Sequence, residues 1–206
     1  MLKHETENRM KTIVDGTIIK KYETPVDMVD QLNDEYEKNK NSLISESHDL
    51  AGRIDSELDI KNILPKLKIF NKINFFINDY IMTLNNFGLL LNPEVDTTIK
   101  SCWINDMKEG EYNPVHTHNG PTNAGLSCVL FLKVPEFVND IKFKHKFKDG
   151  QLCFLGFDRK LIYFQPEVGD FYLFPANQQH VVYPFKTKIK GEVRRSMSFN
   201  LLVNDK

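Results

Sequence analysis

The segment NPVHTHNG, residues 113–120, places two histidines two positions apart between a proline and an Asn-Gly turn. In a β-strand this spacing sends both imidazoles to one face, whereas in a helix they would point about 200° apart. Pro114 argues against a helix, so the spacing favours a strand that presents His116 and His118 together. Imidazole groups on one face can share a divalent metal such as iron, copper, nickel or zinc.

A third candidate ligand, His180, lies far along the chain in GDFYLFPANQQHVVYPF, where it opens a strand after a polar loop. In a jelly-roll barrel, two ligands from one strand end and one from a distant strand meet at the barrel mouth. Three ligands on one side of an octahedral metal leave three open positions, which is the facial arrangement of non-haem iron oxygenases. The ligand types alone leave the identity of the metal open.

The segment VRRSMSFNLLV, residues 193–203, predicts an anion site beside this metal. Alternation places Arg194, Ser196, Ser198 and Asn200 on one face and Arg195, Met197, Phe199 and Leu201 on the other. An arginine on an inward face needs an anion, because an unpaired buried charge is prohibitive. Its planar fork matches a carboxylate, so metal and arginine together predict a receptor for a short dicarboxylate. The neighbouring Arg195 is expected to face outward, and its replacement by alanine is expected to matter little for binding of this ligand.

The elements that position these residues are predicted from periodicity. Residues 24–42 and 64–88 read as helices: the first has Thr24 as a cap and Pro25 at its first position, and the second ends at Gly88. Residues 47–60 look irregular and are expected at the surface. From residue 95 onward, short β-branched and aromatic runs indicate antiparallel strands, at 97–107, 126–135, 140–147, 150–157, 160–166, 169–175, 180–185 and 193–203. In the run 140–147, His145 is expected to be a half-buried residue rather than a ligand.

Helices first and strands later predict an α+β fold, in which N-terminal helices pack on a jelly-roll barrel. The 206 residues suggest one domain, 1–206, with a mainly helical part at 1–94 and a β-barrel core at 95–206.

Four segments, in order, resemble the 2-oxoglutarate and Fe(II)-dependent oxygenases, and most closely their phage and bacterial prolyl-hydroxylase-like branch. They are CWINDMKEGEYNPVHTH, GLSCVLFLKVPE, GDFYLFPANQQHVVYPF and RRSMSFN, within residues 100–203, about half of the chain. The resemblance implies a double-stranded β-helix that uses Fe(II) and takes 2-oxoglutarate and O₂. It also implies oxidative decarboxylation of 2-oxoglutarate coupled to hydroxylation of a substrate, with a protein or peptide side chain as the candidate substrate.

The resemblance also implies roles for individual residues. His116 and His180 would bind iron, Arg194 the distal carboxylate of 2-oxoglutarate, and Ser196 would assist Arg194. Asn105 matches a position that contacts the cosubstrate in related oxygenases. Further candidates are Trp103 and Tyr112 for the pocket wall and Asn200 for support of the site.

Position 118 departs from the family pattern, which has His-x-Asp or His-x-Glu. Either His118 completes a set of three histidine ligands, His116, His118 and His180, or it lies beside the metal and water completes the coordination sphere. Two other readings of the chain remain. One is a cupin-like dioxygenase with three histidines and no oxoacid, and the other is a jelly roll that binds without catalysing.

Composition excludes several other classes. A net charge of −1 and a pI near 6.6 provide no general basis for binding nucleic acid. There is no apolar run long enough to span a bilayer and no apolar secretion signal at the N-terminus. The three cysteines, Cys102, Cys128 and Cys153, lack metal-binding spacing and read as buried free thiols. A cytoplasmic protein is therefore expected.

Overall fold

The computed structural model describes residues 11–14, 17–45, 52–90, 94–118, 125–138, 149–156 and 160–205. This part of the chain contains two α-helices, α1 (Val26–Asn39) and α2 (Lys68–Asn86), each adjoined by a short 3₁₀ turn, Lys40–Ser42 and Leu64–Lys66. Its strands are β1 (Lys11–Val14), β2 (Ile18–Glu23), β3 (Glu57–Asp59), β4 (Val95–Met107), β5 (Asn113–His116), β6 (Gly125–Lys133), β7 (Leu152–Leu155), β8 (Leu161–Phe164), β9 (Asp170–Pro175), β10 (His180–Val182) and β11 (Arg194–Asp205).

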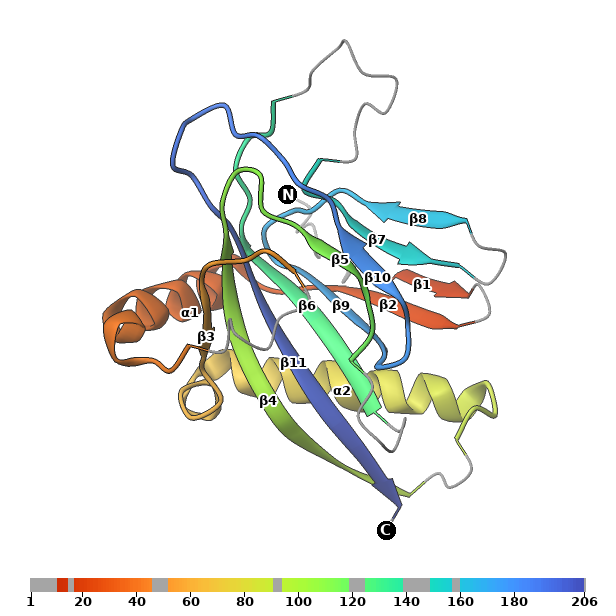
Figure 1. The fold of residues 1–206 in the computed structure, drawn as a ribbon. Coiled ribbons are helices and arrows are strands. Elements are labelled where there is room, and N and C mark those ends of the chain that lie inside the picture. Colours follow the sequence, from red (N-terminus) through yellow and green to blue (C-terminus); the bar gives the residue numbers. More distant parts are fainter. Residues whose placement is uncertain are drawn as a thin grey trace, which may run out of the picture.

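The strands form two antiparallel sheets (Figure 1). The larger sheet has the order β1-β2-β9-β6-β11-β4-β3, and the smaller one has the order β5-β10-β7-β8. One core cluster joins the helices to the larger sheet, and a second joins β6 and β9 of that sheet to β7 and β10 of the smaller sheet. The fold is therefore the predicted α+β double-stranded β-helix, with helices on one side, and its described strands form two open sheets rather than a closed barrel.

The two helices form where the hydrophobic period predicts them. In α1 the buried residues Val29, Leu32 and Tyr36 recur at the spacing of one helix face. The helix begins at Val26, one residue later than expected, because Pro25 has extended backbone and serves as the N-cap. In α2 seven buried side chains make the stripe that covers the sheet: Ile69, Ile73, Phe76, Ile77, Tyr80, Ile81 and Leu84. Gly88 follows with a φ of 65°, a left-handed conformation that ends the helix.

Three strands in the N-terminal part, β1, β2 and β3, were not predicted from the sequence. In β2 the two adjacent lysines make the sequence look like an exposed segment. Four of the six residues of β2 are nevertheless buried, including Lys20. The Lys20 ammonium pairs with Asp79 and donates to Thr83 Oγ1 at 2.7 Å, and both partners lie on α2. Only the packed helix makes a lysine acceptable at this position, and the local sequence carries no sign of that partner.

Residues 52–57, called the strap below, connect the two sheets. The strap joins the chain leading into β5 through Arg53 N–H, which donates to Tyr112 O at 3.0 Å. At its other end the Asp106 N–H of β4 donates to Ser56 O at 3.0 Å. Ile54 and Glu57 are buried, at 5% exposure each. The expectation of an irregular surface segment at 47–60 was therefore wrong in part: Ile54 and Glu57 are buried and β3 is a strand, whereas Arg53 and Asp55 are exposed and residues 47–51 lie outside the described residues.

The remaining expectations on the fold divide as follows. Cys102, Cys128 and Cys153 are buried free thiols, as predicted. Within the described residues, neither helix is long and apolar enough to cross a membrane. The predicted strand 140–147, with His145, lies outside the described residues.

Candidate metal and carboxylate site

Three histidine side chains converge on one point at the mouth between the sheets. His116 ends β5, His118 follows it by two residues, and His180 is the first residue of β10. Strand β10 pairs with β5 so that His180 stands directly opposite His116. The backbone N–H of His118 donates to Ala176 O at 2.8 Å, which holds the third ring beside the other two. One ring nitrogen from each histidine lies within 4.8 Å of the others, close enough to share a metal ion.

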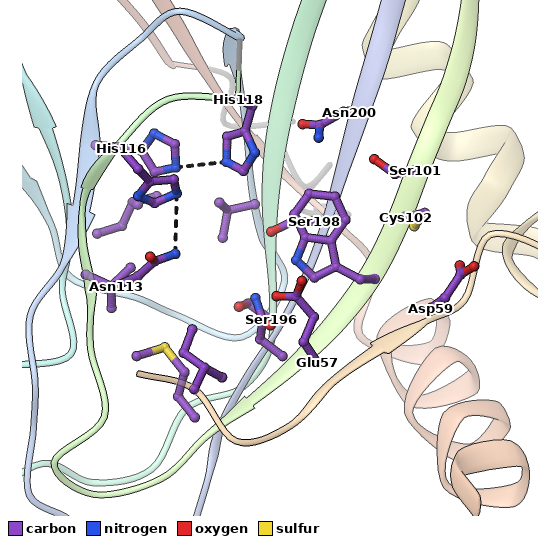
Figure 2. A pocket seen from close by; sticks show the side chains of 18 of the residues that line it. Glu57, Asp59, Ser101, Cys102, Asn113, His116, His118, Ser196, Ser198 and Asn200 are labelled. Carbon is purple, nitrogen blue, oxygen red and sulfur yellow. Dashed lines mark hydrogen bonds between the residues drawn. The ribbon is translucent and has the colours of Figure 1, made fainter. Parts of the chain in front are cut away.

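Backbone carbonyls orient two of the three rings. His116 Nδ1 lies 2.7 Å from Pro114 O, and His180 Nδ1 lies 2.9 Å from Gln178 O. A carbonyl oxygen only accepts, so each Nδ1 carries the proton and each Nε2 keeps a free lone pair. His118 Nε2 lies 3.3 Å from His180 Nε2 (dashed in Figure 2). His116 and His180 thus have tautomers suited to metal binding through Nε2, and His118 Nε2 is the donor in its hydrogen bond to His180 Nε2.

Burial keeps these imidazoles uncharged. It lowers the pKa of His116, lowers that of His118 to about 4, and lowers that of His180 well below its usual value. The neighbouring imidazoles lower the pKa of His118 and His180 further. At neutral pH all three rings are therefore neutral, and the Nε2 lone pairs of His116 and His180 can bind a metal without loss of a proton.

A buried arginine lies in the same cavity, which has a volume of about 590 Å³. Arg194 is 1% exposed and opens β11, and its guanidinium stacks over the Phe131 ring at 4.7 Å. Its Nη1 donates to the sulfur of Met107 at 3.4 Å, whereas Nε and Nη2 have no partner within the described residues. Burial lowers the pKa of Arg194 to about 9, so the side chain remains a cation at neutral pH. Two unpaired N–H groups on a buried cation are suited to an anionic ligand.

Ser196 and Asn105 are neighbours on this wall, because β11 and β4 pair them directly. Both are buried and both line the cavity. In the orientation that satisfies its surroundings, the Asn105 amide donates to Glu57 Oε2 at 2.5 Å and accepts from Trp103 Nε1 at 3.3 Å. Asn105 therefore ties the strap to the aromatic wall of the cavity, and its predicted contact with a cosubstrate remains a prediction.

Of the three further candidates from the sequence, Trp103 and Asn200 line the cavity and Tyr112 does not. Trp103 lines the cavity with its ring 5.7 Å from that of His118, and Asn200 lines the same cavity. Tyr112 is 42% exposed and is not among the residues that line the cavity, so its prediction as a wall residue was wrong. The backbone of Tyr112, rather than its side chain, serves the site by pairing with Arg53 of the strap.

Arg195 faces away from the cavity, as the alternation predicts, but it does not face solvent. It is 1% exposed and binds Asp106 twice, with Nε at 2.6 Å from Oδ1 and Nη2 at 2.8 Å from Oδ2. Nη2 also contacts Glu37 Oε1 at 2.6 Å, and the guanidinium stacks 4.4 Å from the Tyr36 ring centre. Arg195 therefore points away from the cavity as expected, but α1 covers this face of the sheet. The expectation that its replacement matters little for binding of the cavity's ligand stays a prediction.

Sequence reasoning missed two site residues, Glu57 and Asn113. Figure 2 shows Asn113 beside the histidines, with Glu57 and Ser196 across the cavity. The alternation of Glu57, Leu58 and Asp59 was a weak signal for a short strand with one polar face. Asn113 is three residues before His116, a spacing that a regular strand would turn to the opposite face. A register irregularity in the pairing of β5 with β10 explains why Asn113 and His116 nevertheless face the same site.

The chain is similar to known proteins in its family and in its fold. Residues 101–200 match the family model described as 2OG-Fe(II) oxygenase. No curated protein matches the chain. Among solved structures, a Pseudomonas putida prolyl-4-hydroxylase is similar, with a TM-score of 0.58 and 14% identity, over 97% of this chain and 94% of that one.

Two further solved structures share the fold. One is a viral collagen prolyl hydroxylase from Paramecium bursaria Chlorella virus-1 in a 2OG complex, with a TM-score of 0.58, 12% identity, and coverage of 91% of this chain and 96% of that one. The other is a Trichoplax adhaerens prolyl hydroxylase in complex with a hypoxia inducible factor peptide, with a TM-score of 0.58, 12% identity, and coverage of 97% and 84%. At these identities the likeness concerns the fold.

Proposed function

Because the chain belongs to the 2OG-Fe(II) oxygenase family, and is thus a 2-oxoglutarate-dependent dioxygenase that uses Fe(II), we propose that it hydroxylates a protein or peptide side chain. We assign His116, His118 and His180 to the metal, and Arg194 with Ser196 to the distal carboxylate of 2-oxoglutarate. Asn105 is assigned to the wall around that cosubstrate.

One observation carries these assignments. A cluster of three neutral imidazoles and a buried cation with two unpaired N–H groups line a single cavity. The imidazoles fit a divalent metal, and the guanidinium fits a carboxylate that extends away from it. A cavity for a metal alone would need no buried arginine, and leaving such a charge unpaired is costly. The two features together fit a ligand with one chelating end and one anionic end, as 2-oxoglutarate has.

When bound, Fe(II) and 2-oxoglutarate would supply the oxidation, in which one oxygen atom of O₂ ends in succinate, formed together with CO₂, and the other in the hydroxylated substrate. The residues of this chain bind, orient and exclude water. Arg194 and Ser196 fix one end of the cosubstrate, so the other end is directed toward the histidines. Leu152 and Val182 line the cavity and Phe131 stacks on the Arg194 guanidinium, and these apolar neighbours strengthen an ion pair with Arg194.

The peptide assignment has its support in the opposite end of the cavity. Figure 2 shows a group of polar lining residues from β3, β4 and β11 on the side of the cavity away from His116: Asp59, Ser101, Ser198 and Asn200. The Asn200 Oδ1 atom is buried without a partner among the described residues, so it can accept a hydrogen bond from a ligand. Such a wall suits an extended polypeptide, and the Trichoplax neighbour is itself bound to a peptide. We further place the protein in the cytoplasm, in keeping with its three buried free thiols.

Succinate formation tests this proposal directly. Purified protein is incubated with Fe(II), 2-oxoglutarate and O₂, alone and with proline-containing peptides, and succinate and peptide mass are measured. We expect Fe(II)-dependent succinate and a mass increase of one oxygen atom in a peptide. Peptide or small-molecule oxidation that does not consume 2-oxoglutarate would instead support a cupin-like dioxygenase. Absence of Fe(II) binding would support a non-catalytic jelly roll.

A further inference from the structure

Asn113 reaches the metal site through an irregularity of β5. In the pairing of β5 with β10, His116 stands opposite His180 and Asn113 stands opposite Val182. Three residue steps on β5 therefore correspond to two on β10, which is the signature of a β-bulge. The extra residue reverses the alternation, so Asn113 and His116 present their side chains to the same side.

The Asn113 amide is directed at the atom of His116 that a metal would bind. Its Nδ2 lies 3.3 Å from His116 Nε2 (dashed in Figure 2). Because His116 Nδ1 already donates to Pro114 O, Nε2 is an acceptor and the Asn113 amide is the donor. The Asn113 Oδ1 atom is buried and has no partner among the described residues. The Nδ2 end is therefore the part of the amide that faces the histidines, and it can donate to a further ligand there.

The strap holds this amide in position. A Cβ atom added to Gly52 would lie 2.8 Å from Asn113 Oδ1 and 2.6 Å from Tyr112 O. Only a glycine allows the strap to come this close, and the contact leaves the amide little room to rotate away from the histidines. The fold therefore preorganises Asn113 in the way expected for a residue that binds a ligand.

We propose that Asn113 is a binding residue for an oxygen ligand of the metal, at the end of the cosubstrate opposite to Arg194. This inference rests on the proposed function. A metal that takes the Nε2 lone pair of His116 leaves the Asn113 N–H without its acceptor, beside the metal. The strongest new acceptor there is an anionic oxygen of the chelating end of 2-oxoglutarate, and a hydrogen bond to such an oxygen is charge-assisted. With three neutral histidines as ligands, the amide stabilises this anion without adding charge to the site.

Anaerobic titration of metal and cosubstrate tests the role of Asn113. Wild-type protein, Asn113→Ala and Asn113→Ser are titrated with Fe(II) and then with 2-oxoglutarate, and the visible charge-transfer band of the Fe(II)–2-oxoglutarate complex is recorded. For Asn113→Ala we expect Fe(II) affinity within about twofold of wild type, a shifted band and a Kd for 2-oxoglutarate raised about five- to tenfold, the loss of one charge-assisted hydrogen bond. Asn113→Ser, which keeps a donor, should recover part of both changes.

Two variants separate this role from a structural one. Gly52→Ala keeps the amide but pushes on it, so it should shift the band in the same direction as Asn113→Ala. Asn86→Ala removes an amide at the exposed end of α2 and should change neither readout. An unchanged band and Kd in Asn113→Ala, or a loss confined to thermal stability, would overturn the inference alone. Wild-type protein that binds neither Fe(II) nor 2-oxoglutarate would overturn the proposed function together with it.

Discussion

At the scale of single residues, Arg194 is a charge that the folded protein keeps without an anionic partner among the described residues. Burying a cation in this way costs stability, and the cost is returned only when an anion binds. Stability and function therefore oppose each other at this position, as they do at many ligand sites.

Replacement of Arg194 should separate the two. For Arg194→Ala we expect at least about a tenfold weaker affinity for 2-oxoglutarate and nearly unchanged Fe(II) affinity, because only the carboxylate partner is lost. Arg194→Met fills the same space without the charge. The free energy of unfolding of the metal-free variant should therefore be about 1–2 kcal/mol higher than that of the metal-free wild type. Calorimetric titration and urea unfolding measure the two effects. Equal 2-oxoglutarate affinity in wild type and both variants would refute the assignment.

His118 decides how the metal is held. If His118 is a ligand, His118→Ala should weaken Fe(II) binding severely, whereas His118→Asp should retain it, because carboxylate also binds Fe(II). The proximity of His118 Nε2 to His180 Nε2, 3.3 Å, is what motivates this expectation. Anaerobic Fe(II) titration of both variants is the measurement. Undiminished affinity in His118→Ala would leave His116 and His180 as the protein ligands, with water completing the sphere.

At the scale of elements, strand β11 separates two different environments. One face carries Arg194 into the cavity, and the other carries Arg195 into an ion cluster under α1. The cluster comprises Asn33, Tyr36, Glu37, Lys40 and Asp106. It fixes α1 to the strand that holds the candidate cosubstrate site.

Removing Arg195 should therefore be severe. Arg195→Ala leaves the buried Asp106 carboxylate with Lys40 as its remaining cation, and we expect a loss of about 3–5 kcal/mol in the free energy of unfolding. Glu37 is half exposed, so Glu37→Gln at the rim of the same cluster should cost less than about 1 kcal/mol. Urea unfolding of both variants at pH 7 provides the comparison. Arg195→Lys keeps the charge but loses the two-point contact with Asp106. A free energy of unfolding equal to that of wild type in this variant would show that the bidentate pairing contributes little.

The cluster also predicts a pH dependence. Burial alone would raise the pKa of Asp106, but hydrogen bonds from Arg195 and Lys40 outweigh it and lower that pKa overall. A carboxylate with a lowered pKa stabilises the fold above its unfolded pKa, about 3.9, and loses this contribution as the pH falls through its folded value. Asp106→Asn should thus be less stable than wild type at pH 7, and the difference should shrink below about pH 4. Unfolding curves at several pH values would show a constant difference if the cluster were not ionic.

The elements also show what the sequence could predict. Two helix periods placed α1 and α2, and strand alternation predicted which way Arg194 points. The jelly-roll arrangement, which the family resemblance also implies, was needed to bring His116, His180 and Arg194 to one cavity. Asn113 escaped because a bulge reverses the alternation, and a bulge depends on the partner strand β10. The burial of Arg195 was not predicted for a similar reason, since its partner Asp106 comes from a paired strand and Glu37 from a helix packed on it. Local pattern predicts direction, whereas partners distant in sequence decide burial.

At the scale of the whole molecule, the candidate ligands come from segments that are far apart in the chain. The histidines belong to the smaller sheet and its edge, and Arg194 belongs to the larger sheet. A ligand that contacts both groups therefore bridges the two sheets, and its binding energy is also stabilisation of their packing.

Thermal unfolding should report this bridging. Co(II), which does not oxidise readily, and 2-oxoglutarate at about 100 times their dissociation constants should each add about 2.7 kcal/mol of stability. For a chain of this size that corresponds to an increase in Tm of about 5–10 °C for each ligand. His180→Ala should abolish the response to Co(II), and Arg194→Ala should abolish only the response to 2-oxoglutarate. A Tm that does not depend on either ligand in wild type would argue against the bridging site.

The adjacent arginines of β11 have a consequence for how this gene can change its length. Deletion of the first codon of β11, that of Arg194, would move every following side chain of the strand to the opposite face. Arg195 would then enter the cavity and a small serine would enter the ion cluster, so that both sides would fail together. Indels should therefore be excluded from β11, while the exposed turn of residues 188–191 before it can accept them. Substitutions in β11 leave each position on its own face of the sheet, whereas a change in length exchanges the two faces.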